Sequence, residues 1–221
     1  MVGISGYLIA DVRTAFELSL QYVAARRGVK HGVNAYTPHA FSAYVSAVAS
    51  IEAFLNETFL GPMCRSVYHT SALWDLDQDA LQKMDLLIKV VLVPQLLFGV
   101  RFRRDAQPFQ DFALLVRVRN DIVHYKMKSR APKYLADLTQ RGIAITSDIA
   151  GADYPWPWKL SCTEGIRWAH NTACKSAQQL ADLIPKEHKA FLALHAANYT
   201  EITESFVQGW FREHAESKKD A

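Results

Sequence analysis

The spacing of apolar residues along the 221-residue chain predicts a succession of α-helices. In the first of them Val12, Phe16 and Leu20 recur at helical spacing, and Gly28 follows as a stop signal. The predicted helices span about residues 7–27, 38–59, 78–98, 106–128, 161–183 and 185–216. This pattern predicts an all-α fold, an antiparallel bundle of about five to six helices.

Helix boundaries are expected where capping residues and prolines occur. Thr37 should cap the second helix, with Pro38 in its first turn. Pro94 should kink the third helix, because proline removes a backbone hydrogen bond. Ser161 and Glu164 have the spacing of a capping box and should open the fifth helix.

A less regular segment, residues 129–160, separates the fourth and fifth helices. Residues 142–146 and 158–160 could pair there as one small β-hairpin. We therefore expect a single domain with a core of about 7–183, an insertion at 129–160 and a C-terminal helical extension at 185–217.

The chain shows no secretory signal and no candidate membrane span. Its most apolar stretch, residues 86–100, contains Lys89 and Pro94 and is too short to cross a bilayer. The three cysteines, Cys64, Cys162 and Cys174, are widely spaced, which favours reduced, buried thiols and no zinc site. A cytoplasmic protein without a metal, a cofactor or a membrane partner is expected.

Positive charge is concentrated in one part of the sequence. The net charge is +3, but residues 99–133 contain nine basic and three acidic residues, which gives +6 there and −3 elsewhere. The basic residues are Arg101, Arg103, Arg104, Arg117, Arg119, Lys126, Lys128, Arg130 and Lys133. Such a field favours an anionic partner such as RNA, and the plain alternative is a solvated helix side next to a basic loop.

The fourth predicted helix breaks its own apolar pattern. Its core stripe passes through Phe112, Leu115 and Ile122, yet the position between the last two is Arg119. A buried guanidinium needs a carboxylate, a water-filled cleft or a subunit interface. Glu52, in the apolar second helix, is the candidate carboxylate. That ion pair could serve only to fix the register of the helices, or it could belong to a functional site.

The same helix contains a histidine suited to acid–base chemistry. His124 follows Asn120 by four residues, so the two share one side of the helix, whereas Arg119 lies about 140° away from His124. An imidazole can transfer protons near neutral pH, and an arginine can bind a phosphate. The Arg–His spacing alone is weak, because Arg26 with His31 and Arg117 with His124 also match it.

Two segments resemble the HEPN family (higher eukaryote and prokaryote nucleotide-binding). The string Arg119-Asn120-Asp121-Ile122-Val123-His124-Tyr125 looks like the HEPN signature, and residues 46–57, with Glu52 and Asn56, resemble the second helix of that family. The resemblance covers about residues 7–183 and gives no counterpart for 129–160 or the last helix.

The resemblance implies a metal-independent ribonuclease that acts as a homodimer. His124 would promote attack of a ribose 2′-hydroxyl, Arg119 would bind the phosphate, and Asn120 would position either group. The products would be 2′,3′-cyclic phosphate and 5′-hydroxyl ends. Supporting roles would fall to Glu52, Asn56, Asp121 and Tyr125, and RNA-backbone contacts to Arg101, Arg103, Arg104, Arg117, Lys126 and Lys128. Such enzymes act as toxins or in antiviral defence, with an antitoxin or another regulatory protein as partner.

Two other interpretations remain open at this point. In one, the chain is a non-catalytic HEPN scaffold that binds RNA, nucleotide or protein, and His124 is sealed from solvent. In the other, it is an unrelated helical bundle with a chance motif, and the helix of Arg119 does not pack on the helix of Glu52.

Overall fold

The computed structural model describes residues 3–25, 37–126, 130–145, 155–192 and 194–216. In these ranges all the regular elements are helices and no β-strand is present, which confirms the all-α prediction. The elements are α1 (Ile4–Ala25), α2 (Ala40–Thr58), α3 (Pro62–Val67), η1 (Ala72–Asp75), α4 (Gln78–Lys83), α5 (Leu86–Phe98), α6 (Phe109–Val123), α7 (Tyr134–Gln140), η3 (Trp156–Leu160), α8 (Thr163–Asp182), α9 (Lys186–Leu192), η4 (Leu194–Asn198) and α10 (Glu204–Glu216), where η marks a 3₁₀-helix.

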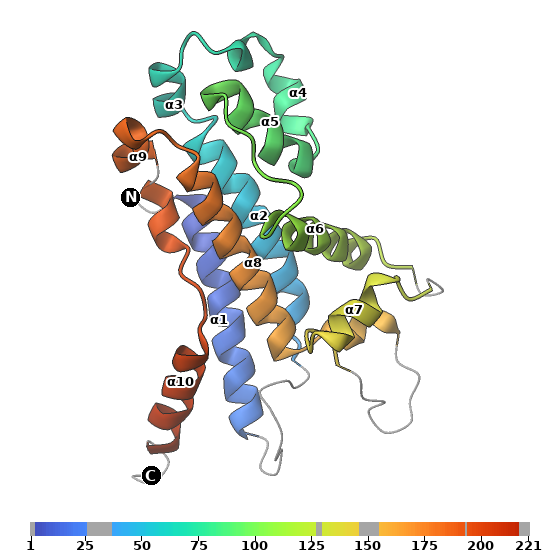
Figure 1. Ribbon diagram of the computed structural model, residues 1–221. Helices are drawn as coiled ribbons and strands as arrows, with labels where there is room; N and C mark the ends of the chain where they lie inside the picture. Colours follow the sequence, from blue (N-terminus) through green and yellow to red (C-terminus); the bar gives the residue numbers. More distant parts are fainter. Residues whose placement is uncertain (1–2, 26–36, 127–129, 146–154, 193, 217–221) are drawn as a thin grey trace.

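Three long helices, α1, α2 and α8, pack side by side and form the body of the molecule (Figure 1). Their facing sides supply many of the buried apolar side chains, among them Val12, Phe16, Val48, Ile51 and Ile166. In Figure 1, α1 runs opposite to α2 and α8. The short helices α3, α4 and α5 lie beyond one end of this body, and α10 lies beside α1 near the other end.

Small residues on α8 allow it to approach α2 closely. The buried side of α8 includes Ala169, Ala173 and Ala177. At Gly165 the approach is tightest, because an added Cβ would lie 2.2 Å from the Tyr44 hydroxyl oxygen. That hydroxyl is buried and donates a hydrogen bond to the Leu160 carbonyl at 3.1 Å. A side chain at residue 165 would therefore collide with a fixed group.

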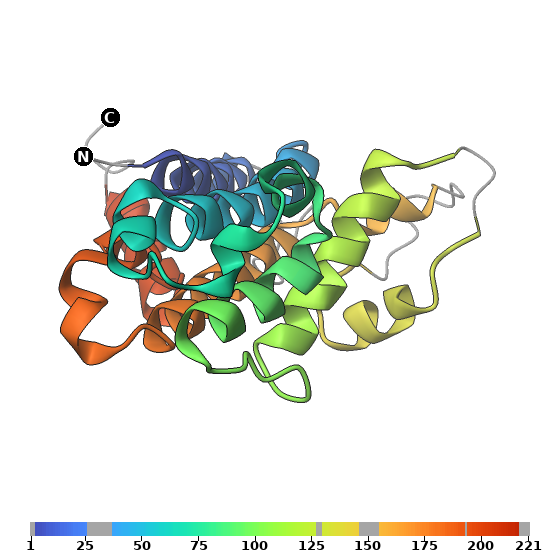
Figure 2. The same ribbon diagram turned by 90° about the horizontal axis from the view of Figure 1, so that it is seen from above.

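α6 leaves the body instead of lying along it. Its first half packs between α2 and α8, and its second half extends outward in both ribbon views (Figures 1 and 2). α7 and η3 lie beneath and beside this outer half. The segment with the unusual polar residues is therefore the part of α6 with the least cover from the core.

Several predicted helix ends were wrong. α2 begins at Ala40, two residues later than predicted and with His39 as its N-cap, although the Thr37 hydroxyl does accept a 3.4 Å hydrogen bond from the His39 backbone N–H. The third predicted helix is broken at Met84 and Asp85, because the Asp85 carboxylate accepts from the backbone N–H groups of Leu87 and Ile88 and starts α5. Pro94 lies inside α5. Local capping by one aspartate thus overrides the continuous apolar pattern.

The predictions of a capping box at Ser161 and of one long C-terminal helix were also wrong. Ser161 lies outside α8, whose N-cap is Cys162, and Glu164 instead forms an ion pair with Arg167 at 2.7 Å. The predicted C-terminal helix is divided into α9, η4 and α10. It is divided because Tyr199 turns into the core, where its hydroxyl donates to the Ser50 carbonyl at 2.8 Å.

The expected β-hairpin does not form in the described residues. Where its second strand was predicted, Trp156–Leu160 is the 3₁₀-helix η3. One backbone hydrogen bond does join the two segments, from Ile145 N–H to the Lys159 carbonyl at 2.7 Å. The rest of the predicted hairpin, residues 146–154, lies outside the described residues.

A carboxylate at the end of α2 caps the start of α1. Glu57 accepts hydrogen bonds from the backbone N–H and the hydroxyl of Ser5, the latter at 2.5 Å. Negative charge at a helix N-terminus is stabilising, because unsatisfied N–H groups point toward it. This contact helps to hold α1 and α2 as an antiparallel pair.

Among the described helices none is both long enough and apolar enough to traverse a bilayer.

Candidate functional site

The candidate site lies at the outer end of α6. Phe109, Phe112, Leu115, Val116 and Val118 form the buried part of this helix. The predicted helix ran to residue 128, but α6 ends at Val123, and His124 is its C-cap. The His124 backbone N–H still bonds to the Asn120 carbonyl at 2.9 Å, which keeps the imidazole one helical turn beyond Asn120.

Asn120 and His124 are both exposed, whereas Arg119 is half-buried on the core stripe, as its spacing predicts. None of these three side chains makes a hydrogen bond or an ion pair to any residue that the structure describes. The scaffold interpretation expected His124 to be sealed from solvent, but in this chain its side chain is exposed. Arg119 and His124 lie on sides of α6 that differ by about 140°, so Arg119 could meet a phosphate at His124 only through its long side chain or from a second copy of the chain.

The predicted ion pair between Arg119 and Glu52 does not form. The Glu52 carboxylate instead lies 3.3 Å from the Nζ of Lys89, on α5. The Lys89 side chain is fully buried and also donates to the Gln82 carbonyl at 3.3 Å, whereas the Glu52 side chain is 39% exposed. An unpaired charge costs more free energy at a fully buried ammonium than at a half-buried guanidinium. The Glu52 carboxylate therefore pairs with Lys89 and not with Arg119.

Lys89 is a residue whose role sequence reasoning missed. The available signal was a lone lysine in the apolar run 86–100, a position where a buried ammonium needs an anion. Asn56, one turn beyond Glu52 on α2, is exposed and has no polar partner among the described residues. No contact between Arg119 and Glu52 or Asn56 therefore supports the expected supporting roles of these two residues.

Asp121 and Tyr125, the other expected supporting residues, attach neighbouring elements to α6. The Asp121 carboxylate accepts a 2.8 Å hydrogen bond from the Tyr134 hydroxyl of α7. Burial and this contact with Asp121 raise the pKa of Tyr134, while Arg117 opposes the shift. The ring of Tyr125 meets the ring of Trp156 edge-on, with centroids 5.9 Å apart. These contacts hold α7 and η3 beside the helix end.

The predicted RNA-binding residues fall into two groups. Arg101, Arg103 and Arg104 precede α6, while Arg117 and Lys126 lie near His124. The 15 residues of α6 separate these ends by about 22 Å, so the charged segment is not one continuous patch. Lys128 lies outside the described residues.

The first basic group is partly neutralised. Arg103 pairs with Asp105 at 3.2 Å, and the hydrogen bond between them raises the pKa of the arginine and lowers that of the carboxyl. Arg104 lies over the ring of Phe109, 5.9 Å from its centroid. Arg117 and Lys126 are exposed, and both lie within seven residues of His124 along the chain.

The cysteines are free and buried, as expected. Burial raises the pKa of each thiol to about 12, which keeps Cys64, Cys162 and Cys174 protonated near neutral pH. The described residues contain no cluster of three or more metal-ligating side chains.

Comparisons with protein-family models, with curated proteins and with solved structures find no match for this chain. The resemblance to HEPN domains therefore rests on the quoted residues and their placement. Two features of that placement bear on it: α6 packs on α2, and the Asn120–His124 pair is exposed at the end of α6.

The arrangement offers the parts of a phosphodiester-cleaving site. An exposed imidazole beside an exposed amide can accept a proton and orient a substrate. A half-buried guanidinium without a described anion is suited to a phosphate, which it can bind through two parallel hydrogen bonds.

Proposed function

We propose that the protein is a metal-independent endoribonuclease of HEPN type, with His124, Asn120 and Arg119 as its catalytic residues. The observation that carries the proposal is the open end of α6, where His124 and Asn120 are exposed one turn apart and Arg119 has no described partner. The packing of α6 on α2 supports it, because the alternative of a chance motif predicts that the helix of Arg119 does not pack on the helix of Glu52.

The proposed reaction is an internal transesterification of RNA. The His124 imidazole takes the proton of a ribose 2′-hydroxyl, whose oxygen then attacks the adjacent phosphorus. The bond from phosphorus to the 5′-oxygen breaks, that oxygen takes up a proton from water, and the His124 imidazolium returns its proton to the solvent. Arg119 offsets the charge that builds up on the phosphate, and Asn120 orients the phosphate or the imidazole. A 2′,3′-cyclic phosphate and a 5′-hydroxyl result, with no net change in atoms or charge.

The site is completed by a second copy of the chain in this proposal. Arg119 and His124 lie on different sides of α6, and Val123, 53% exposed, lies between them on the helix surface. Pairing two α6 ends would cover Val123 and bring Arg119 of one copy toward His124 of the other. A regulatory protein such as an antitoxin would act by covering the same surface.

The assay is incubation of RNA with purified protein in EDTA. Wild type should cleave and leave cyclic phosphate ends, His124→Ala should not, and His69→Ala should match wild type, because His69 is an exposed histidine far along the chain from α6. Undiminished cleavage by folded His124→Ala would remove His124 from the mechanism. No cleavage by wild type, with RNA binding that depends on Arg119, would favour a non-catalytic binding module instead.

Mixing two inactive variants tests the composite site. If His124→Ala and Arg119→Gln chains exchange freely, half of the dimers are mixed and each has one intact site, so about a quarter of wild-type activity should return. Arg212→Gln, at an exposed arginine of α10, serves as the matched charge control and should be fully active. Activity that stays at the level of the separate variants would place both groups in one chain's site.

A further inference from the structure

Four polar side chains share one side of the outer half of α6. An α-helix turns about 100° per residue, so Asn120, Asp121 and His124 all lie within about 60° of the direction of Arg117. The hydrogen bond from the His124 backbone N–H to the Asn120 carbonyl, at 2.9 Å, keeps His124 in this register although it is the C-cap. Arg119, in contrast, lies about 160° away from Arg117 around the helix axis.

This side of α6 faces the solvent. The side chains of Arg117, Asn120 and His124 are exposed, whereas the opposite side of the helix carries the buried residues Phe112 and Leu115. The outer half of α6 also projects from the body of the molecule in both ribbon views (Figures 1 and 2). One extended ligand could therefore meet the guanidinium, the amide and the imidazole together.

The natural partner of Arg117 on this surface is Asp121. Residues four apart on a helix are neighbours, so an ion pair between these two would be expected. The Asp121 carboxylate instead accepts the 2.8 Å hydrogen bond from the Tyr134 hydroxyl. Arg117 makes no hydrogen bond and no ion pair within the described part of the chain, and its charge acts on Tyr134 only by opposing the rise in the pKa of that hydroxyl. A guanidinium on the side of His124 is thus left without an anion.

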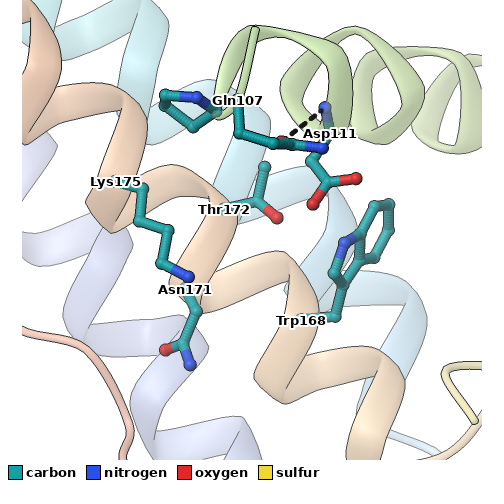
Figure 3. Close-up of a pocket in the computed structure, with 7 residues that line it drawn as sticks. Gln107, Asp111, Trp168, Asn171, Thr172 and Lys175 are labelled. Atoms are coloured by element: carbon teal, nitrogen blue, oxygen red, sulfur yellow. Dashed lines mark hydrogen bonds between the residues drawn. The ribbon is translucent and has the colours of Figure 1, made fainter. Parts of the chain in front are cut away.

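Contacts at both ends of α7 hold the Tyr134 hydroxyl at Asp121. Tyr134 begins α7 and lies at the outer part of α6, while Arg141, the C-cap of α7, pairs with Asp111 in the first turn of α6 at 3.0 Å. Asp111 and Trp168 of α8 line the same small pocket (Figure 3), and the Arg141 guanidinium lies 6.0 Å from the centroid of the Trp168 ring. α7 is therefore fixed antiparallel to α6.

We propose that Arg117 binds the scissile phosphate of RNA in the same chain as His124. The two residues are seven apart, about 10 Å along the helix axis, with Asn120 between them. The guanidinium can bind two phosphate oxygens while the imidazole takes the proton of the 2′-hydroxyl. Tyr134 is a positioning residue, because it keeps the Asp121 carboxylate from neutralising Arg117. The inference rests on the proposed function, since RNA supplies the phosphate, and it adds an arginine from the chain of His124 to the Arg119 of a second copy.

Phosphate binding can be tested without cleavage. A 2′-deoxy dinucleotide has a single phosphate and no 2′-hydroxyl that could attack it, and it should shift the imidazole signals of His124 in NMR spectra, assigned by their loss in His124→Ala. Arg117→Gln should weaken binding about ten- to hundredfold, the effect of one charge-assisted hydrogen bond. Arg212→Gln, at an exposed arginine of α10, should bind as wild type does. Equal binding by Arg117→Gln and wild type would overturn the proposal, and so would a wild type that does not bind the dinucleotide.

Mixing inactive variants tests whether Arg117 acts in the chain of His124. A mixture of Arg117→Gln and His124→Ala chains contains no chain with both groups, so its activity should stay at the level of the separate variants. The mixture of Arg119→Gln and His124→Ala should instead recover about a quarter of wild-type activity. Recovery in the Arg117→Gln mixture would place Arg117 at the His124 of a second copy and overturn the assignment to one chain.

The role of Tyr134 is tested by releasing Asp121. Tyr134→Phe frees the carboxylate to pair with Arg117 and should weaken binding of the dinucleotide about two- to fivefold, the effect of a surface ion pair. Adding Asp121→Asn to Tyr134→Phe should restore binding, because no carboxylate then competes with the phosphate. A purely structural role of Tyr134 predicts no restoration, and that outcome would refute the positioning role.

The two proposals fail in different ways. Binding of the 2′-deoxy dinucleotide that depends on Arg117, without cleavage of RNA, would remove the ribonuclease and leave the phosphate site. Cleavage that Arg117→Gln leaves unchanged would remove Arg117 and leave the ribonuclease. If both hold, Arg117→Gln should lower the rate at saturating ribodinucleotide, which has only the scissile phosphate, about a hundredfold.

Discussion

The contribution of the Glu52–Lys89 ion pair to the free energy of unfolding can be tested by mutation. Its Nζ–Oε1 distance of 3.3 Å corresponds to an attraction of about 1.3 kcal/mol in water and about 5 kcal/mol at an effective dielectric of 20. Glu52 is 39% exposed and Lys89 is fully buried, so the true value lies between these limits. We expect Glu52→Gln to lower the free energy of unfolding by about 2 kcal/mol, because it leaves a buried ammonium without an anion.

The reverse substitution should behave differently. In Lys89→Met the apolar side chain fills the buried site and Glu52 turns to solvent, so the free energy of unfolding should change by less than about 1 kcal/mol in either direction. The double variant should match Lys89→Met, which makes the coupling between the two residues about 2 kcal/mol.

Urea unfolding of the wild type, the two single variants and the double variant measures this coupling. A second cycle with Glu52→Gln and Arg119→Gln should give a coupling within about 0.5 kcal/mol of zero, since the two side chains share no contact. Strong coupling of Glu52 to Arg119 and none to Lys89 would refute this assignment and restore the ion pair expected from the sequence.

Two further predictions concern the body of the fold. Gly165→Ala should lower the free energy of unfolding by about 1–3 kcal/mol, because its Cβ would lie 2.2 Å from the Tyr44 hydroxyl oxygen; a variant as stable as wild type in urea unfolding would contradict the close contact of α2 and α8. Burial lowers the pKa of His170 to about 4, from 6.5, so the unfolded chain binds a proton more readily than the folded one. Stability should then be complete above pH 6.5 and fall by about 3 kcal/mol toward pH 4, and His170→Gln, which cannot titrate, should lose this part of the pH dependence in denaturant titrations.

Much of the candidate site could be read from helical periodicity. The spacing of Phe112, Leu115 and Arg119 correctly placed the arginine on the buried stripe of α6, and the four-residue spacing of Asn120 and His124 correctly placed them on one side. These features depend only on residues within one helix, whose geometry fixes which side chains are neighbours.

The partners of these residues could not be read in the same way. Glu52 meets Lys89, 37 residues away, and Asp121 meets Tyr134 of α7, a helix that the apolar pattern did not predict. A carboxylate in an apolar helix indicates that a cation should lie nearby. Which lysine or arginine that is depends on how deeply each of them is buried. That depends on the packing of α5 against α2.

The sequence by itself determined an all-α protein, the approximate course of α1, α2, α6 and α8, and the polar interruption of α6. The tertiary structure decided that α6 projects from the body and ends at Val123, so that His124 is exposed, and that Tyr134 of α7 holds the Asp121 carboxylate, so that Arg117 has no anion among the described residues. The physical reason is that helix periodicity is set by neighbours along the chain. Burial and charge pairing are instead set by segments distant in sequence, which meet only when the helices pack.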